Sequence, residues 1–92
     1  IKDGLRHSSL FSYDLSRLEN KKKVLFIRRL FGYSQKRNST RYSTEGYLKE
    51  IGGMKLGRNF LLIPIEKSRD MQKFFAVHKI TPEIREVWVR EN

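Results

Sequence analysis

The sequence predicts a single α+β domain with elements in the order strand, helix, strand, strand, helix, strand. Two segments place apolar residues at helical spacing, and several shorter segments alternate or run apolar as strands do. The 92 residues suffice for one domain, residues 1–92, with a small core. Six Phe, four Tyr and one Trp argue against disorder.

The first strand is predicted at residues 9–15 and the first helix at residues 19–31, ending at Gly32. The apolar face of the strand is formed by Phe11, Tyr13 and Leu15. Arg28 and Arg29 fall mostly on the polar face of the helix. The apolar residues of this helix recur at helical spacing and are Val24, Ile27, Leu30 and Phe31.

The second helix is predicted at residues 67–79, where Ser68 starts it. Its apolar stripe consists of Met71, Phe74, Phe75 and His78. A strand precedes it at residues 60–65, a run too short for a buried helix, and another follows at residues 84–90. In this last strand, one face carries Val87 and Val89, and the other carries Ile84 and Trp88. We expect Trp88 in the core or at a dimer contact.

Residues 39–51 alternate Thr and Tyr with polar residues and are predicted as a strand, followed by a two-residue hairpin turn at Gly52 and Gly53. Residues 34–40 are polar and basic, which is typical of a flexible loop.

The alternative for this region is a short helix over residues 44–51, capped by Ser43 or Thr44 and ended by Gly52. With the strand, the element order is the split βαβ arrangement of ferredoxin-like folds, an antiparallel sheet with both helices on one face. The other face is then free for a partner or for a second copy of the chain.

Charge is the strongest compositional signal, because 20 Lys and Arg stand against 10 Asp and Glu and leave a net charge of +10. The sequence pI is about 10.2. Residues 1–61 hold 14 Lys and Arg and five Asp and Glu, whereas residues 62–92 are nearly balanced. The excess predicts a polyanionic partner that meets a basic face within residues 17–61, with residues 62–92 as scaffold.

Other classes of protein are excluded by composition. The chain has no Cys, which excludes disulfide scaffolds, thiol catalysis and Cys-ligated zinc and fits a cytoplasmic, reducing location. Its apolar runs are far shorter than the roughly 20 residues that span a bilayer, so no membrane partner is expected. The chain begins at Ile1, not Met, as a fragment or a processed form does.

Candidate contacts to nucleic acid lie in a stretch, residues 21–41, that contains no acidic residue. The basic residues there are Lys21, Lys22, Lys23, Arg28, Arg29, Lys36, Arg37 and Arg41, and two more, Lys55 and Arg58, follow. Cations in this number bind phosphates and release counterions. The interleaved Tyr33, Tyr42 and Tyr47 either stack on unpaired bases or pack across the sheet with their hydroxyls in water.

Tyr13 and Asp14, followed by Leu15 and Ser16, close the first predicted strand. With the chain length, the element order and the helix end at residues 28–33, they resemble the small CRISPR-associated adaptation subunit, whose first strand closes with a Tyr-Asp pair. The resemblance implies a dimer, metal binding by Asp14, and action as a metal-dependent nuclease or as a non-catalytic DNA-holding subunit. The departures from the family pattern are Ser8, Ser9 and Ser12 in the first strand, Gly52 and Gly53 in the hairpin, and the basic loop at residues 55–58.

From these observations we expect a small, non-catalytic, basic protein that contacts the phosphate backbone of structured RNA or duplex DNA and needs no cofactor. It acts alone, as a homodimer, or as a component of a larger ribonucleoprotein such as a ribosome-associated particle. The alternative is a metal-dependent endonuclease or DNA-holding subunit in which Asp14 binds Mg²⁺. Asp14 otherwise caps the turn into the first helix.

Overall fold

The structure is a computed structural model that describes residues 4–37 and 40–90, with the backbone alone for residues 35–37, 41 and 42. The elements are β1 (Leu5–Ser12), α1 (Asn20–Phe31), β2 (Gly32–Arg37), β3 (Thr40–Glu45), α2 (Tyr47–Glu50), β4 (Met54–Gly57), β5 (Phe60–Pro64), the 3-10 turn η1 (Ile65–Lys67), α3 (Ser68–Val77) and β6 (Glu83–Arg90). The α+β class is confirmed. The order of elements differs from the expected ferredoxin-like order, because the chain has extra strands and a third helix.

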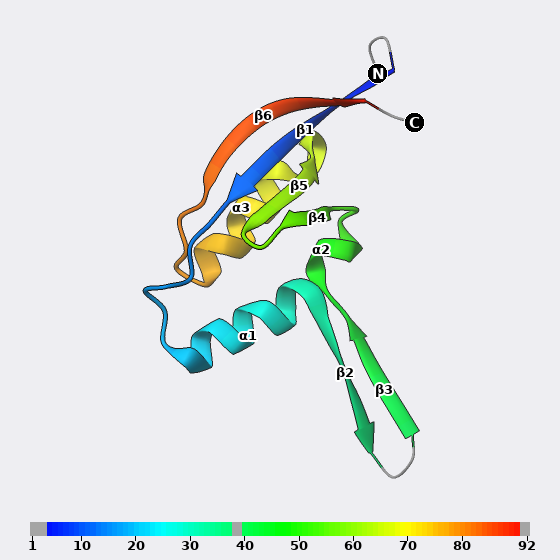
Figure 1. The fold of residues 1–92 in the computed structure, drawn as a ribbon, viewed down its shortest axis with the longest axis vertical. Helices are drawn as coiled ribbons and strands as arrows, with labels where there is room; N and C mark the ends of the chain where they lie inside the picture. Colours follow the sequence, from blue (N-terminus) through cyan, green and yellow to red (C-terminus); the bar gives the residue numbers. More distant parts are fainter. Residues whose placement is uncertain (1–3, 38–39, 91–92) are drawn as a thin grey trace.

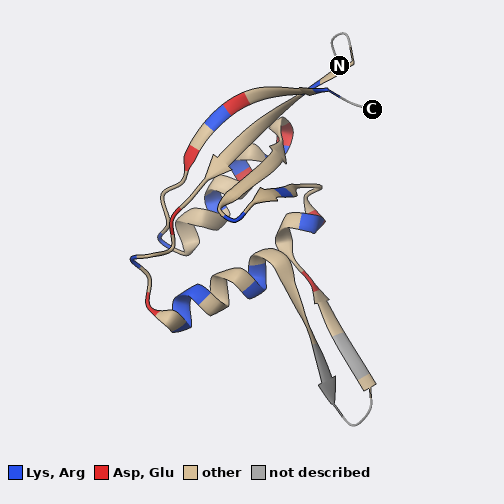
Figure 2. Cartoon of the chain, viewed as in Figure 1, with Lys and Arg blue, Asp and Glu red and all other residues tan. Residues whose placement is uncertain are grey.

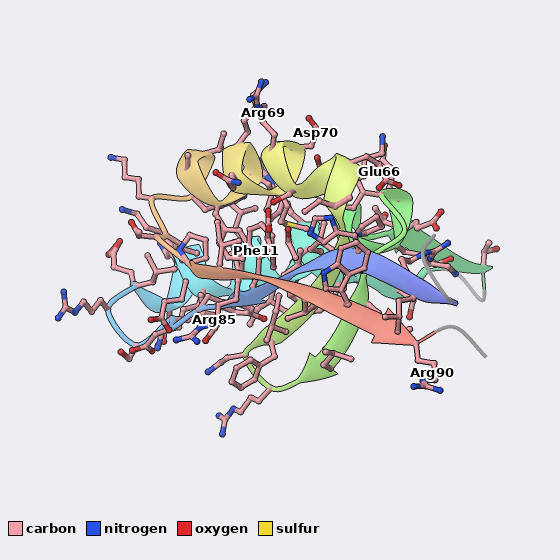
Figure 3. The ribbon with its side chains drawn as sticks, turned by 90° about the horizontal axis from the view of Figure 1, so that it is seen from above. Phe11, Glu66, Arg69, Asp70, Arg85 and Arg90 are labelled. Atoms are coloured by element: carbon pink, nitrogen blue, oxygen red, sulfur yellow. The ribbon has the colours of Figure 1, made fainter. Side chains whose placement is uncertain are left out.

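The main sheet is antiparallel and has the strand order β4-β5-β1-β6 (Figure 1). Its central strand, β1, pairs on one side with β5, where Phe11 lies opposite Leu61, and on the other with β6, where Phe11 lies opposite Ile84. Figure 3 shows Phe11 between the sheet and α3. Among the described elements, no helix is long and apolar enough to cross a bilayer.

An aromatic cluster joins this face of the sheet to two helices. The ring of Phe75 in α3 lies 5.7 Å from that of Phe11 in β1 and 5.4 Å from that of Phe26 in α1. Tyr13, just after β1, contacts both helical rings at 5.4 and 5.8 Å. Because aromatic pairs add to the hydrophobic effect of burial, this cluster is the centre of the core. The fully buried apolar side chains are Phe11, Phe26, Leu30, Leu61, Ile63, Met71 and Phe75.

The buried face of α1 differs from the prediction. Phe26 and Leu30, one turn apart, are fully buried, whereas Val24 and Ile27, which the spacing assigned to the core, are both more than 40% exposed. The physical reason is that residues 24–27 are all apolar, so the sequence pattern does not define one face. Phe26 packs inward because its ring meets Tyr13 and Phe75.

Several predicted elements are confirmed with small shifts. β5, α3 and β6 lie within two residues of their expected ends, and α3 buries Met71 and Phe75. β1 begins four residues earlier than predicted, because pairing with β5 and β6 keeps its serines, Ser8 and Ser9, in the sheet. Trp88 is 55% exposed and is therefore not a core residue.

Residues 34–40 were expected to form a loop, but most of them belong to β2 and β3, a two-stranded antiparallel ribbon. The strand prediction for residues 39–51 is correct only for β3. The helix alternative for residues 44–51 is correct only for α2, whose N-cap is Gly46 and not Ser43 or Thr44. Gly52 and Gly53 follow α2 and lead into β4, so the expected hairpin turn there is wrong. At Gly52 the φ angle of 77° suits a helix end, where glycine is favoured.

The ribbon is attached to the body by a narrow neck. There the backbone of Gly32, at the end of α1, meets the backbone of Gly46, at the end of β3. A Cβ on Gly32 would collide with the Thr44 carbonyl oxygen, and a Cβ on Gly46 would collide with the Phe31 carbonyl carbon. Glycine at both positions is thus required for the two segments to touch.

Gly46→Ala is expected to lower the free energy of unfolding by about 2–4 kcal/mol, because backbone atoms cannot move aside as a flexible side chain does. Urea denaturation measures this change. Gly57→Ala is the matched control, since its Cβ would meet only the Phe60 side chain at an ordinary 3.5 Å, and it should cost less than about 1 kcal/mol. Equal losses in both variants would contradict the close approach at the neck.

Candidate nucleic-acid interface

Four of the predicted site residues surround a cleft of about 550 Å³ between α1, β4 and the turn after β1, named here the α1–β4 cleft. Its charged lining residues are Lys23, Lys55, Arg58 and Asp14. The remaining lining residues are Tyr13, Leu15, Ser16, Ile27, Phe31 and Asn59. Lys55 and Arg58 belong to one hairpin, in β4 and in the β4–β5 turn, whereas Lys23 lies on α1, far away in the sequence, and the fold brings it beside them.

Strand register places Lys55 in this cleft. It lies opposite Leu61 of β5, and cross-strand partners share one face of a sheet, so Lys55 emerges on the face that α1 covers. Its Nζ atom lies 4.9 Å from the centre of the Phe31 ring, within the range of a cation–π contact. The residue after Arg58, Asn59, is joined to the segment just after β1, because its carbonyl accepts a hydrogen bond of 3.2 Å from the Tyr13 amide. This bond holds the turn that carries Arg58 beside the cleft.

Asp14 fixes the turn that leads from β1 toward α1. Its Oδ1 atom accepts a hydrogen bond of 2.9 Å from the Ser16 amide, as the capping interpretation predicted. Hydrogen bonds from the amide and hydroxyl of Ser16, with smaller effects of Arg17 and Lys23, hold the pKa of Asp14 below its ordinary value. The cleft therefore presents three cations beside one oriented carboxylate, an arrangement that suits a phosphate held on its cationic side.

Lys22, Arg28 and Arg29 of α1 line other clefts, so the structure divides the predicted cluster. Lys22 and Arg29 line a smaller cleft of about 280 Å³ between α1 and the end of α3, together with His78 and Lys79. Sequence reasoning missed Lys79 because residues 62–92 were assigned to the scaffold. Its φ of 60° is a conformation that glycine usually occupies after a helix. A lysine just beyond an apolar helical stripe was the available signal.

Arg29 also lines a third cleft, of about 500 Å³. The other predicted site residues of this cleft are Arg28, Tyr33 and Tyr47, and its acidic residues are Glu45 and Glu50. The guanidinium of Arg28 lies 5.4 Å from the centre of the Tyr33 ring. Since two carboxylates share this lining, the cations here are partly compensated, although no acidic residue lies near them in the sequence.

The three predicted stacking residues have different settings. Tyr33 is 45% exposed and lies under Arg28. The ring of Tyr47 is stacked on that of Phe74 at 4.8 Å, so one of its faces is already covered, and burial is the main cause of its raised pKa. The side chain of Tyr42 lies outside the described part of the chain, as do those of the predicted contacts Lys36, Arg37 and Arg41.

Lys and Arg are spread along α1 and around the β4–β5 turn in Figure 2. Comparisons of this chain with protein-family models, curated proteins and solved structures give no match. In the described residues, no group of three or more His, Cys, Asp or Glu is arranged to hold a metal ion.

His78 makes the stability of the second cleft depend on pH. Its ring lies 5.3 Å from the Phe26 ring and 4.9 Å from the Phe74 ring, and this burial, with a smaller effect of Arg29, lowers its pKa. The folded state thus takes up a proton at lower pH than the unfolded state. The free energy of unfolding should fall as pH drops below about 6.5, the ordinary histidine value.

Urea denaturation between pH 8 and pH 5 tests this expectation. His78→Gln removes the titrating group, so its stability should change less over this range than that of the parent protein. Protonation of Asp14 does not interfere, because its pKa is below that of an ordinary carboxyl. An identical pH dependence in parent and variant would show that His78 does not carry the effect.

Proposed function

We propose that this protein binds the phosphate backbone of structured RNA or duplex DNA, without catalysis and without a cofactor. The observation that carries the proposal is the α1–β4 cleft, where Lys23 of α1 meets Lys55 and Arg58 of the β4–β5 hairpin around one hollow. Like charges repel, so their convergence is favoured when an anion binds between them. Phosphates spaced along a nucleic acid are anions of this kind.

The start of α1 supports the proposal. Lys21, Lys22 and Lys23 occupy its first turns, where the helix dipole is positive. The N-cap residue is Glu19, whose side chain makes no capping hydrogen bond, and the first turn carries no acidic residue. An anion at a helix N-terminus stabilises the helix by about 0.3–1 kcal/mol, and a cation there should destabilise it by a similar amount. A bound polyanion would neutralise the positive charge of these three lysines and remove the unfavourable interaction with the helix dipole.

The β2–β3 ribbon supports it in a different way. It extends away from the body (Figure 1), and within the described chain no third strand pairs with it. Its exposed residues are polar or aromatic, such as Tyr33, Ser34 and Ser43, so it adds little to the core. Its strands also include Lys36 and Arg41, which are register partners. A polar ribbon with cations along its strands is suited to reach over a nucleic acid.

This role fits a cytoplasmic protein or a component of a ribonucleoprotein particle. Binding should be strongly salt-dependent, because each phosphate neutralised by Lys or Arg releases condensed counterions. Affinity is expected to fall by orders of magnitude between about 50 and 200 mM salt if several phosphates are contacted.

The double variant Lys55→Ala/Arg58→Ala is expected to weaken binding to a labelled RNA or DNA duplex about tenfold or more at ~50 mM salt. It should also lower the slope of log K against log salt by about 2, because two phosphate contacts are lost. Fluorescence anisotropy titrations at four salt concentrations measure both quantities.

The matched control is Lys67→Ala/Arg69→Ala, which removes the same two charges from the exposed surface of η1 and α3 (Figure 3 shows Arg69 pointing away from the core). It should keep most of the affinity. If both double variants weaken binding equally, net charge and not the cleft determines binding, and the proposed site is wrong.

The alternative function, a metal-dependent nuclease resembling the CRISPR-associated adaptation subunit, depends on Asp14. The favourable observation is that Asp14 lines the same cleft as Lys23, Lys55 and Arg58, where a bound phosphate would lie. A hydrated Mg²⁺ needs as few as one or two carboxylates. In this structure the same carboxylate accepts the Ser16 amide, which gives it a local structural role as well.

Asp14→Asn separates the two functions, because the side-chain oxygen of Asn still accepts the Ser16 hydrogen bond while the charge is removed. Under the proposed binding function, the variant should bind a duplex several-fold more tightly, since a negative charge leaves the cleft. Under the nuclease function, it should abolish cleavage that the parent protein shows with Mg²⁺. Gel assays of binding and cleavage, run in parallel, distinguish these outcomes.

A further inference from the structure

The two edges of the main sheet differ in how they are protected. β4 at one edge has four residues, includes Lys55, and is irregular between Lys55 and Gly57. A short, bulged edge with a lysine resists pairing with another strand. β6 at the other edge has eight residues in regular register with β1 from Glu83 to Arg90, and it has no proline. Within the described chain β1 is its sole strand neighbour, so its outer edge is open.

We propose that β6 pairs antiparallel with β6 of a second copy of this chain, around a two-fold axis at Trp88. The two four-stranded sheets would then form one continuous sheet. Cross-strand partners must have their side chains on the same face of the sheet. When two identical strands pair antiparallel around a two-fold axis perpendicular to the sheet, this is possible only if one residue lies at the axis and pairs with its own copy. Each register is therefore defined by its central residue.

Charge selects the register centred on Trp88. In it, Glu86 lies opposite the partner's Arg90 on the face that also carries Trp88, and two-fold symmetry forms this pair twice. On the other face Val87 lies opposite the partner's Val89. Charged residues thus meet opposite charges, and apolar residues meet apolar residues.

Neighbouring registers lack this match. Centring on Val87 would set Glu86 against Trp88 and Ile84 against Arg90. Centring on Glu86 would place the two copies of this carboxylate directly opposite each other, which is destabilising. Because a register shift of one residue replaces every cross-strand pair, β6 has one favourable self-pairing among these three.

The central residue is exposed and held in place. Trp88 is 55% exposed, and its ring stacks on that of His7 in β1 at a centroid distance of 4.4 Å and an angle of 14°. His7 also lies 3.5 Å from Glu86, between its Nε2 atom and a carboxylate oxygen. A large aromatic ring fixed before binding loses little entropy when a partner covers it. Since paired strands bury less area than a standard interface, we expect dissociation in the micromolar range.

The test uses the whole chain, purified at high salt until free of nucleic acid. Sedimentation velocity from about 5 to 500 µM should show a monomer–dimer equilibrium in the range expected for a small interface. The chain has a single Trp, so its fluorescence should shift to shorter wavelength over the same concentrations as Trp88 becomes buried. Protein that remains monomeric at 500 µM would overturn the proposal, whatever its affinity for nucleic acid.

Charge reversal then tests the register. Glu86→Arg and Arg90→Glu should each weaken dimerisation at least tenfold, and the double variant should restore it. Glu83→Arg makes the same change in charge on the same strand, but Glu83 has no partner in this register among the described residues, so dimerisation should persist. Circular dichroism confirms that each variant is folded. Equal weakening by Glu83→Arg and Glu86→Arg, or no rescue by the double variant, would show that β6 does not pair in this way.

Discussion

The contact of Phe26 with Phe75 and Tyr13 is the interaction on which the rest of the structure depends. These rings come from α1, α3 and the segment just after β1, and their centres lie between 5.4 and 5.8 Å apart. α1 is otherwise a highly charged helix with a narrow buried face. Because Phe26 anchors it, Lys23, one turn earlier, is brought to the mouth of the α1–β4 cleft. An apolar contact therefore sets the position of the charged groups.

Electrostatics then distinguishes the two sides of α1. On one side Glu45 and Glu50 lie in the same cleft as Arg28 and Arg29, and their carboxylates reduce the local positive potential. On the other side the single carboxylate of Asp14 is engaged by Ser16. The net charge of the whole chain describes neither surface, because folding brings acidic residues that are remote in the sequence close to some of the basic residues of α1 and not to others. An approaching anion responds to the local electrostatic potential, which differs between these two clefts.

Sequence reasoning succeeded where local patterns decide the structure. The stripe of α3 and the short apolar run of β5 identified these elements, and the Asp14 turn followed from residue type and position. It identified β3 from its alternation but failed for β2, where Ser, Gln, Lys and Arg follow one another with no apolar face to mark a strand. The α1–β4 cleft could not be found either, since it depends on α1 and the turn after β1 lying beside the β4–β5 hairpin, and these segments are far apart in the sequence.

The neck at Gly32 and Gly46 separates the body, whose sequence is constrained by core packing, from the ribbon, whose sequence is not. No described side chain of the ribbon belongs to the buried core, which is built from the main sheet, the helices and their connecting segments. Insertions, deletions or substitutions in β2 and β3 would therefore leave the packing of the body intact as long as both glycines remain. The ribbon can change its length and chemistry over evolution almost independently of folding. Such a segment allows one stable body to acquire new binding preferences without losing stability.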